Sequence, residues 1–454
     1  MAQYKSRVRG IGDRSVARAE GIRSFGTYPK SVRARLQRLQ DEAEERPDIY
    51  IRISHVKYLN ESRHLLAKYL NAPPSSIVLQ PNATTALNTI LRNLVFHEHD
   101  TIICFSTTYG AVVKTLLSIA ETTPVAVTSI PLTTQAALSN ASILAAVEST
   151  VLNQRAAGLN PRALMLDAIV SEPGIRMPFE ALVSLCRRLG IYSVVDGAHT
   201  IGMIPLDLTA LDADFFVTNA HKWLYVPRAC AIMYVPQRNQ ALIRTSFPTS
   251  ANFVPNIPPG KLIPPVETAV STDPEDNTPF VKLFEYTGTL NSQAYNCVGE
   301  ALRFRERVCG GEEATQRYVY SIASRGAQVV AKMLGTEILD NKEGTLHNGL
   351  ALVNVRLPID LEKVKEMHNA AHPQDIHPEQ DSDVVPAWVQ IVRVWIATRF
   401  IEEYNTSVPI IWWGNAFWTR LSGQIYLDLS DFEAIARQFR VLCGRVSRGD
   451  HLKD

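Results

Sequence analysis

The fold is decided by two short stretches, Val194–Val195–Asp196–Gly197–Ala198–His199 and Asp214–Phe215–Phe216–Val217–Thr218–Asn219–Ala220–His221–Lys222–Trp223. Each begins as an apolar run and ends abruptly in polar or small residues. This pattern is typical of a buried strand that delivers side chains to the carboxyl edge of a parallel sheet. Open α/β sheets bind their ligands in the crevice at that edge. The two strand ends therefore bring a carboxylate, two imidazoles and a lysine to one crevice.

Lys222 and Asp196 carry most of the chemical information in these stretches. A lysine aimed into such a site can form a Schiff base with a carbonyl compound. Pyridoxal 5′-phosphate (PLP) pairs that lysine with an acid on its ring nitrogen. Either motif alone also fits a surface Lys–Trp turn or a helix-capping aspartate. Together, in this order and spacing, they favour a cofactor site.

The composition is that of an ordinary globular protein. The chain has 454 residues, of which 46% are hydrophobic and 20% charged, enough for two domains that share a large core. With 46 Lys plus Arg against 45 Asp plus Glu, the formal net charge is +1, so no bulk charge attracts nucleic acid or an anionic membrane. Apolar runs stay below the ~18 residues of a membrane span. We expect a cytoplasmic protein without nucleic-acid or membrane partners.

The six cysteines are scattered and lack the spacing of metal ligands, so we expect no metal site. Several lie in apolar runs and read as small core residues, which suits a reducing compartment. A catalytic cysteine is left open by the sequence, although no motif supports one.

Strand-like and helical runs alternate from about residue 77 to residue 235, which predicts a mostly parallel α/β sheet covered on both faces. A proline-rich stretch, 246–280, follows and is typical of a functional lid or a disordered loop. Beyond it, Ala351–Leu357 and Ala416–Tyr426 read as strands. A helix over Asp431–Leu442 would start with a capping box of Ser430 and Glu433. We expect three parts: an N-terminal segment, a large α/β domain and a smaller C-terminal α+β domain, over residues 1–30, 31–290 and 291–454.

The motif pair Asp196–Gly197–Ala198–His199 and Asn219–Ala220–His221–Lys222 resembles the class V aminotransferase group of fold-type I PLP enzymes. The closest resemblance is to its isopenicillin-N-epimerase-like branch, which includes fungal hercynylcysteine sulfoxide lyases and a loline-alkaloid pathway enzyme. The resemblance runs from about Ser24 to Tyr426. One motif departs from the pattern: where relatives open with Asn–His–Gly–Ser–Phe–Gly, this chain has Gly21–Ile22–Arg23–Ser24–Phe25–Gly26.

The resemblance implies PLP as the cofactor, with Lys222 as its Schiff-base lysine and Asp196 on its pyridinium nitrogen. The phosphate would lie at the start of a helix, where free N–H groups favour an anion. Taken alone, that segment is also an ordinary helix N-cap. The phosphate contacts implied are Ala83, Thr84, Thr85, Asn219 and His221.

Further residues receive roles from the same resemblance. Tyr109 would stack on the cofactor ring, or simply pack before a helix. Ser171 and His199 would reach the phenolic oxygen, with a core histidine as the alternative for His199. Thr287 and Thr289 would reach the phosphate from a partner subunit, which implies a homodimer with shared active sites.

Arg420 stands among aromatic residues, and a buried arginine must have its charge paired. Its planar fork matches a carboxylate, and the resemblance implies that it holds the substrate α-carboxylate. An internal salt bridge is the alternative.

The expected function is that of a PLP enzyme, a lyase or transferase, acting on an amino-acid-derived substrate through a carbanion at Cα. We expect a step in fungal specialised metabolism resembling the loline-alkaloid pathway. The alternative is a C–S lyase of the hercynylcysteine sulfoxide or cysteine desulfurase type. Epimerisation and true transamination are less favoured.

Overall fold

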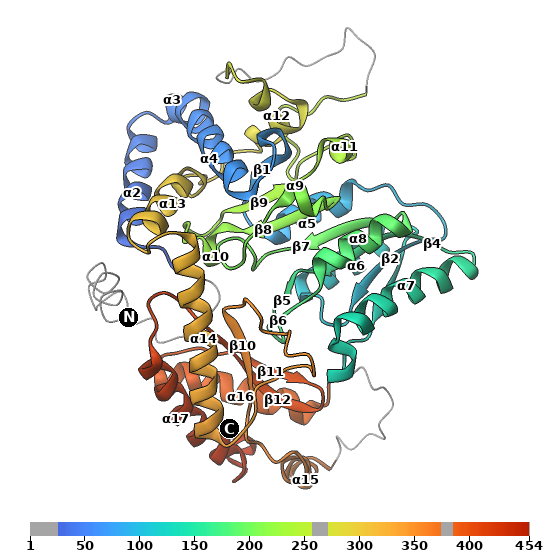
Figure 1. The fold of residues 1–454 in the computed structure, drawn as a ribbon, viewed down its shortest axis with the longest axis vertical. Coiled ribbons are helices and arrows are strands. Elements are labelled where there is room, and N and C mark those ends of the chain that lie inside the picture. The colour runs from blue at the N-terminus through green and yellow to red at the C-terminus, as the bar shows by residue number, and fades with distance from the viewer. Residues whose placement is uncertain (1–25, 257–270, 374–384, 454) are drawn as a thin grey trace.

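A large sheet and a small sheet organise the chain (Figure 1). The computed structural model describes residues 26–256, 271–373 and 385–453. Most of the departing N-terminal motif, Gly21 to Phe25, lies outside these ranges. Within them, no helix is long and apolar enough to cross a membrane.

The large sheet has seven strands in the order β1-β9-β8-β7-β4-β2-β3. Of the described strands in it, β9 alone runs opposite to the other six. The sheet is therefore mostly parallel, as predicted. The strands are β1 (Ile77–Gln80), β2 (Asp100–Phe105), β3 (Ala126–Ile130), β4 (Asn160–Asp167), β7 (Tyr192–Asp196), β8 (Phe215–Asn219) and β9 (Ala231–Tyr234).

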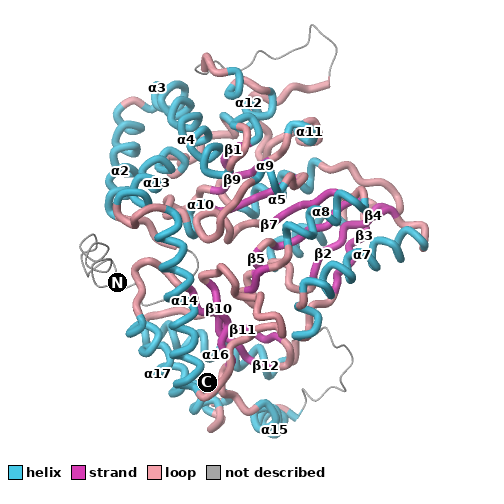
Figure 2. The backbone as a smooth tube through the Cα atoms, in the orientation of Figure 1, coloured by secondary structure: helices cyan, strands magenta, loops and turns pink. Residues whose placement is uncertain are grey.

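Alternate residues of the central strands enter two different cores, because successive side chains of a strand point to opposite faces. Val194 and Phe215 pack in the core that includes α5 and α6, whereas Val195 and Phe216 pack in the core that includes α7 and α8. The sheet is therefore covered on both faces (Figure 2). The helices are α5 (Ala83–Asn93), α6 (Gly110–Ala120), α7 (Asn140–Ala156) and α8 (Phe179–Leu189).

The small sheet is antiparallel, in the order β10-β12-β11, and a long helix leads to it from the large sheet (Figure 1). That helix, α14, follows α13 across a turn at Gly310 and Gly311, both with positive φ. Its far end packs against β10 and α17. The elements are α13 (Val298–Arg307), α14 (Glu312–Leu334), β10 (Leu352–Arg356), α15 (Leu361–Ala371), α16 (Ala387–Tyr404), β11 (Ile410–Trp413), β12 (Ala416–Ser422) and α17 (Leu429–Val446).

Short elements complete the described chain. The N-terminal helices α2 (Lys30–Glu45) and α4 (His55–Leu70) are joined by α3 (Pro47–Ile49) and a π-helical turn. The remaining elements are α9 (Leu208–Leu211), α10 (Ala220–Trp223), α11 (Gln237–Gln240), α12 (Pro279–Glu285), β5 (Ile169–Val170) and β6 (Ile175–Arg176).

The predicted capping box at Ser430 and Glu433 is wrong. The N-cap of α17 is Asp428, whose carboxylate accepts from the Ser430 amide at 2.8 Å. The Asp428 amide in turn donates to Asp431 at 2.7 Å. The helix starts two residues before the predicted Asp431, because a carboxylate at Asp428 satisfies the first amides. The strand predicted over Ala416–Tyr426 ends at Ser422, and the prediction omitted α16 and β11.

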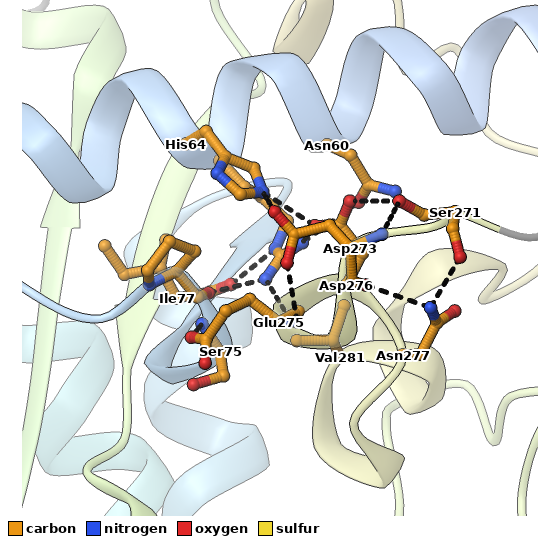
Figure 3. Close-up of polar contacts among 12 residues, drawn as sticks. Asn60, His64, Ser75, Ile77, Ser271, Asp273, Glu275, Asp276, Asn277 and Val281 are labelled. Carbon is orange, nitrogen blue, oxygen red and sulfur yellow. Dashed lines mark hydrogen bonds and ion pairs between the residues drawn. The ribbon is translucent and has the colours of Figure 1, made fainter.

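The buried guanidinium of Arg63 fastens the end of the proline-rich stretch to the large sheet, and Figure 3 shows its partners Ile77, Glu275 and Asp276 close together. Arg63 of α4 is 1% exposed and donates to the Ile77 carbonyl at 2.8 Å and to Asp276 at 2.8 Å. It also donates to the carbonyls of Pro74 and Glu275. His64, the next residue, lies 2.9 Å from the same Asp276 oxygen. One side chain thus fixes the start of β1 and the residues that lead into α12.

We predict that Arg63→Met lowers the free energy of unfolding by about 3–5 kcal/mol, because it leaves the buried Asp276 carboxylate without its cation. Urea unfolding followed by circular dichroism measures the change. The control is Arg317→Met, which removes an exposed pair with Glu313 and should cost less than about 1 kcal/mol. Equal unfolding midpoints for the two variants would contradict the clamp.

Candidate active site

A cavity of about 370 Å³ opens at the carboxyl ends of β4, β7 and β8. Most of the site residues predicted from the sequence line this cavity, and they belong to separate elements. Those lining it are Ala83, Thr84, Tyr109, Ser171, Asp196, His199, Asn219, His221, Lys222 and Arg420. Further lining residues include Asp167, Glu172, Ser407, Val408 and Pro409, which the sequence analysis did not single out.

Lys222 belongs to a chain of three side chains held by hydrogen bonds. The indole N–H of Trp223 donates to His199 Nδ1 at 3.3 Å, and His199 Nε2 lies 3.1 Å from Lys222 Nζ. Burial holds the pKa of His199 well below its usual range, so the ring is neutral. Since Nδ1 accepts from the indole, the ring hydrogen is on Nε2. In this tautomer the Nε2–H of His199 can donate to Lys222 whenever the lysine is a neutral amine with a lone pair.

The electrostatic surroundings of Lys222 agree with this arrangement. Burial lowers its pKa to about 8; Asp196 and Asp167 act to raise it and Arg420 acts to lower it. With a pKa near 8, Lys222 has a larger share of the neutral, nucleophilic amine at neutral pH than an ordinary lysine, which is almost wholly protonated.

Two carboxylates meet at the floor of the cavity. Asp196 ends β7 and is paired in register with Asp167, the last residue of β4. Both are 4% exposed. The Ala198 amide donates to Asp196 at 2.8 Å. Burial and the neighbouring Asp196 hold the pKa of Asp167 well above its usual range, and burial also raises that of Asp196. Asp167 was missed because its strand looked purely structural.

The N-terminus of α5 lies at the cavity, and the anion site predicted there stays a prediction. The Asn219 side chain accepts from the Ala83 amide at 3.0 Å, and the Asn82 side chain accepts from the Thr85 amide at 2.8 Å. Ala83 and Thr84 line the cavity. Thr85 does not belong to its described lining.

His221 is oriented from outside the cavity. Its Nδ1 lies 3.0 Å from the Cys230 carbonyl, which can only accept, so Nδ1 carries the hydrogen. Burial lowers the pKa of His221 to about 4, and the imidazole is neutral. A phosphate placed against its other nitrogen would favour protonation.

Arg420 of β12 brings a cation from the small sheet to the cavity. It is 6% exposed, and its Nη1 donates to the carbonyl of Ser171 at 2.5 Å and to the Ser171 hydroxyl at 2.9 Å. Burial lowers its pKa and the charge of Glu172 raises it. Gly174 makes room for it: a Cβ there would lie 2.7 Å from Arg420 Cδ. Ser171, predicted to reach a cofactor oxygen, is thus also the partner of Arg420.

Two glycines bring other segments against the lysine turn. Gly26 has φ +70°, and a Cβ there would lie 2.3 Å from the Lys222 carbonyl oxygen. Gly202 has φ +78°, and its Cβ would lie 2.6 Å from the carbonyl carbon and oxygen of Trp223. Both positions require glycine.

Thr287 and Thr289 lie away from the described lining of the cavity. Gly288 and Thr289 are exposed, and the Tyr286 hydroxyl lies 3.4 Å from Thr289 Oγ1. Tyr109 lines the cavity and is still 47% exposed. These residues form part of the outer surface of this chain.

All six cysteines are buried and reduced, and none belongs to the cavity lining. Burial raises the thiol pKa, for example to about 11 at Cys104. In the described ranges, no group of three or more His, Cys, Asp or Glu side chains is arranged to hold a metal ion.

Comparison with known proteins places these features in a family context. The family model described as aminotransferase class-V matches residues 51–252. The L-cysteine desulfhydrase-like protein lolT1 of Epichloe uncinata is 36% identical, with 93% of this chain and 92% of that protein aligned. Hercynylcysteine sulfoxide lyase of Schizosaccharomyces pombe is 29% identical over 93% and 92%. A solved structure of a C-DES mutant with glycine covalently linked to the PLP cofactor superposes with a TM-score of 0.69. Its identity is 17%, covering 94% of this chain and 99% of that one.

We predict that Lys222 of the cofactor-free protein reacts with formaldehyde and cyanoborohydride with a midpoint near pH 8, because its pKa is about 8. At that pH about half of the Lys222 amine is neutral, against about 0.4% for an ordinary lysine. Peptide mapping across pH 6–10 measures the rate, which should rise with pH. Asp196→Asn should lower the midpoint and Arg420→Leu should raise it, since these charges act in opposite directions. A midpoint near 10 would argue against the neutral lysine.

Proposed function

The chain belongs to the class-V aminotransferase family, and from this premise we propose that it is a PLP-dependent C–S lyase acting on an S-substituted cysteine-type amino acid. The observation that carries the proposal is Lys222, which has a lowered pKa, lies 3.1 Å from His199 and shares one cavity with Asp196 and the Arg420 cation. The names of relatives support the bond: a desulfhydrase-like protein, a sulfoxide lyase and a solved cystine C–S lyase.

The residues present fit PLP. The cavity of about 370 Å³ is within the usual range of ligand sites, roughly 300–1,000 Å³. Lys222 would hold the cofactor, Asp196 would pair with its ring nitrogen, and the start of α5 at Ala83 and Thr84 would receive the phosphate. Asp196 is well suited because a buried carboxylate needs a cationic partner. When bound, PLP withdraws electrons from the substrate Cα and so eases the loss of a proton there.

Arg420 and Lys222 would then divide the work on the substrate. The guanidinium fork binds the α-carboxylate in place of, or together with, the Ser171 oxygens that it now contacts. With PLP and substrate bound, Lys222 would be the amine that accepts the Cα proton. The Nε2–H of His199, by donating to the neutral amine of Lys222, would fix the direction of that amine's lone pair.

The proposed reaction balances without an added oxidant or reductant. The Cα–H bond breaks and its proton goes to Lys222; the Cβ–S bond breaks and its electron pair leaves on sulfur. Hydrolysis of the remaining three-carbon unit yields pyruvate and ammonia. A cysteine nucleophile has no role in this scheme, in accord with the position of all six cysteines outside the cavity lining.

A second candidate is another step in fungal specialised metabolism that acts through the same Cα carbanion. It is favoured by the 36% identity to a loline-type protein. It shares every step through the Cα proton loss and differs in what then happens at the substrate side chain.

We further propose that two copies of this chain share their active sites. Thr287 and Thr289 would reach the partner's cofactor phosphate. In support, Thr289 is exposed beside Leu290, which is 47% exposed, and Tyr109 at the cavity mouth is equally so. A second copy that covered these exposed apolar side chains would remove them from water.

We predict that Lys222→Ala protein folds but no longer retains PLP as a borohydride-reducible adduct, because the amine that holds it is gone. Absorbance after reduction and peptide mapping of the parent give the answer. Lys453→Ala, an exposed lysine, should keep the adduct. Mapping of the reduced cofactor to another lysine in the parent would overturn the site.

We also predict that the parent releases pyruvate from a cysteine S-conjugate or sulfoxide. Arg420→Leu should raise KM, because the loss of the charge-paired contact costs about 2–5 kcal/mol of substrate-binding free energy. Arg356→Leu, which removes an exposed cation from the same small sheet, should leave KM unchanged. Lactate dehydrogenase coupling detects pyruvate. Carbon dioxide or a cyclised amine without pyruvate would favour the second candidate, and Cα deuterium exchange alone would favour epimerisation.

A further inference from the structure

Arg305 of α13 is an enclosed guanidinium that has no place in the chemistry above. The residue is 1% exposed. Its Nη1 donates to the Trp223 carbonyl at 2.8 Å and its Nη2 to the Gly202 carbonyl at 2.9 Å. Its Nε donates to Glu312 at 2.7 Å, and Nη2 also contacts the second Glu312 oxygen. The guanidinium carbon lies 5.1 Å from the centre of the Tyr225 ring.

The two carbonyls that Arg305 binds belong to the two turns that build the site. Trp223 directly follows Lys222, and Gly202 closes the turn that begins at Asp196 and carries His199. These turns touch where Arg305 binds, since a Cβ on Gly202 would lie 2.6 Å from the Trp223 carbonyl. A planar fork with donors in fixed directions is suited to holding two acceptors at a set separation.

The Trp223 carbonyl needs such a partner. It ends α10, a helix of four residues, and carbonyls at the end of a helix have no partner within it. Buried carbonyls are costly when unpaired. By binding this one, Arg305 sets the position of Trp223, whose indole orients His199, and of Lys222, whose Nζ meets His199.

We propose that Arg305 is a positioning residue for Lys222, which fixes the lysine turn against the Asp196–His199 turn through the carbonyls of Trp223 and Gly202. The proposal rests on the proposed function in one respect, that Lys222 holds the cofactor. Arg305 acts through the backbone: the charges that act most on Lys222 are those of Asp196, Arg420 and Asp167.

The Arg305–Glu312 pair also spans the turn between α13 and α14. Glu312 is the first residue of α14, directly after Gly310 and Gly311. Since α14 packs on β10, the neighbour of the strand that carries Arg420, the pair links the lysine turn to the small sheet. A purely structural role for the pair predicts a loss of stability with an unaltered site, whereas the positioning role predicts a changed site in folded protein.

The test uses Arg305→Lys in the full-length holoenzyme. Lysine keeps a cation beside Glu312, but its single nitrogen cannot hold both carbonyls as the fork does. We expect the pH titration of the cofactor absorbance band to shift and kcat to fall by about 10²-fold, the effect of a small misplacement of reacting groups. KM should change little, because Arg420 is untouched. The matched control is Arg303→Lys on the same helix, exposed and paired with Glu300, which should alter neither measurement.

The outcomes separate this proposal from the proposed function. If reduced cofactor maps to Lys222 but Arg305→Lys keeps the parent's titration and kcat, the positioning role is overturned and the lysine assignment stands. If the cofactor maps to another lysine, the proposed function fails. If Arg305→Lys does not fold, Glu312→Gln is the second test variant. Glutamine has nearly the shape of glutamate but no charge, so Arg305 is held less firmly. A shifted titration supports positioning, whereas reduced thermal stability with the parent's titration assigns the pair to the fold alone.

Discussion

The hydrogen-bond chain from Trp223 through His199 to Lys222 is the constraint on which the candidate site depends. An indole can only donate, so it fixes the imidazole tautomer, and that tautomer presents an N–H to the lysine. Donation from His199 needs the neutral form of the lysine, and burial favours that form by lowering the pKa of Lys222 to about 8. The packing of Trp223 against His199 and the protonation state of Lys222 therefore depend on each other. A site built this way needs its two turns at a fixed spacing, and this is where Gly202 and Arg305 meet.

The sheet supplies that spacing because β4, β7 and β8 are adjacent and parallel. Parallel neighbours end at the same edge, so Asp167, Asp196 and the turn bearing Lys222 converge without any long loop. The cation Arg420 comes from a different sheet, and Gly174 allows its side chain to pass close to the backbone. The floor of the cavity is therefore fixed by the large sheet, whereas its wall at Arg420 depends on where α14 and the small sheet lie.

The sequence predicted the parts of this arrangement that are encoded locally. Strand ends at Asp196 and Asn219, and the helix start at Ala83, follow from apolar runs that stop at polar residues. Asp167 could not be predicted, because its role comes from the register between β4 and β7, which no local pattern contains. Arg305 was missed for a related reason: the pattern of an amphipathic helix predicts that a single arginine is exposed, whereas its burial depends on turns 82 and 103 residues away. The capping box failed because Asp428, outside the pattern considered, competes for the same amides.

The paired carboxylates set the charge balance of the site. Asp167 and Asp196 are in register on neighbouring strands, both nearly inaccessible to water, and two like charges so placed are not both ionised cheaply. The charge of Lys222 and the Ala198 amide favour ionisation of Asp196, whereas the charge of Asp196 itself raises the pKa of Asp167 further. These directions favour the proton on Asp167 over Asp196. The floor of the cavity then presents one carboxylate and one neutral acid: the first can pair with a cationic ring nitrogen, and the second can donate a hydrogen bond, as buried protonated carboxylic acids do in other sites.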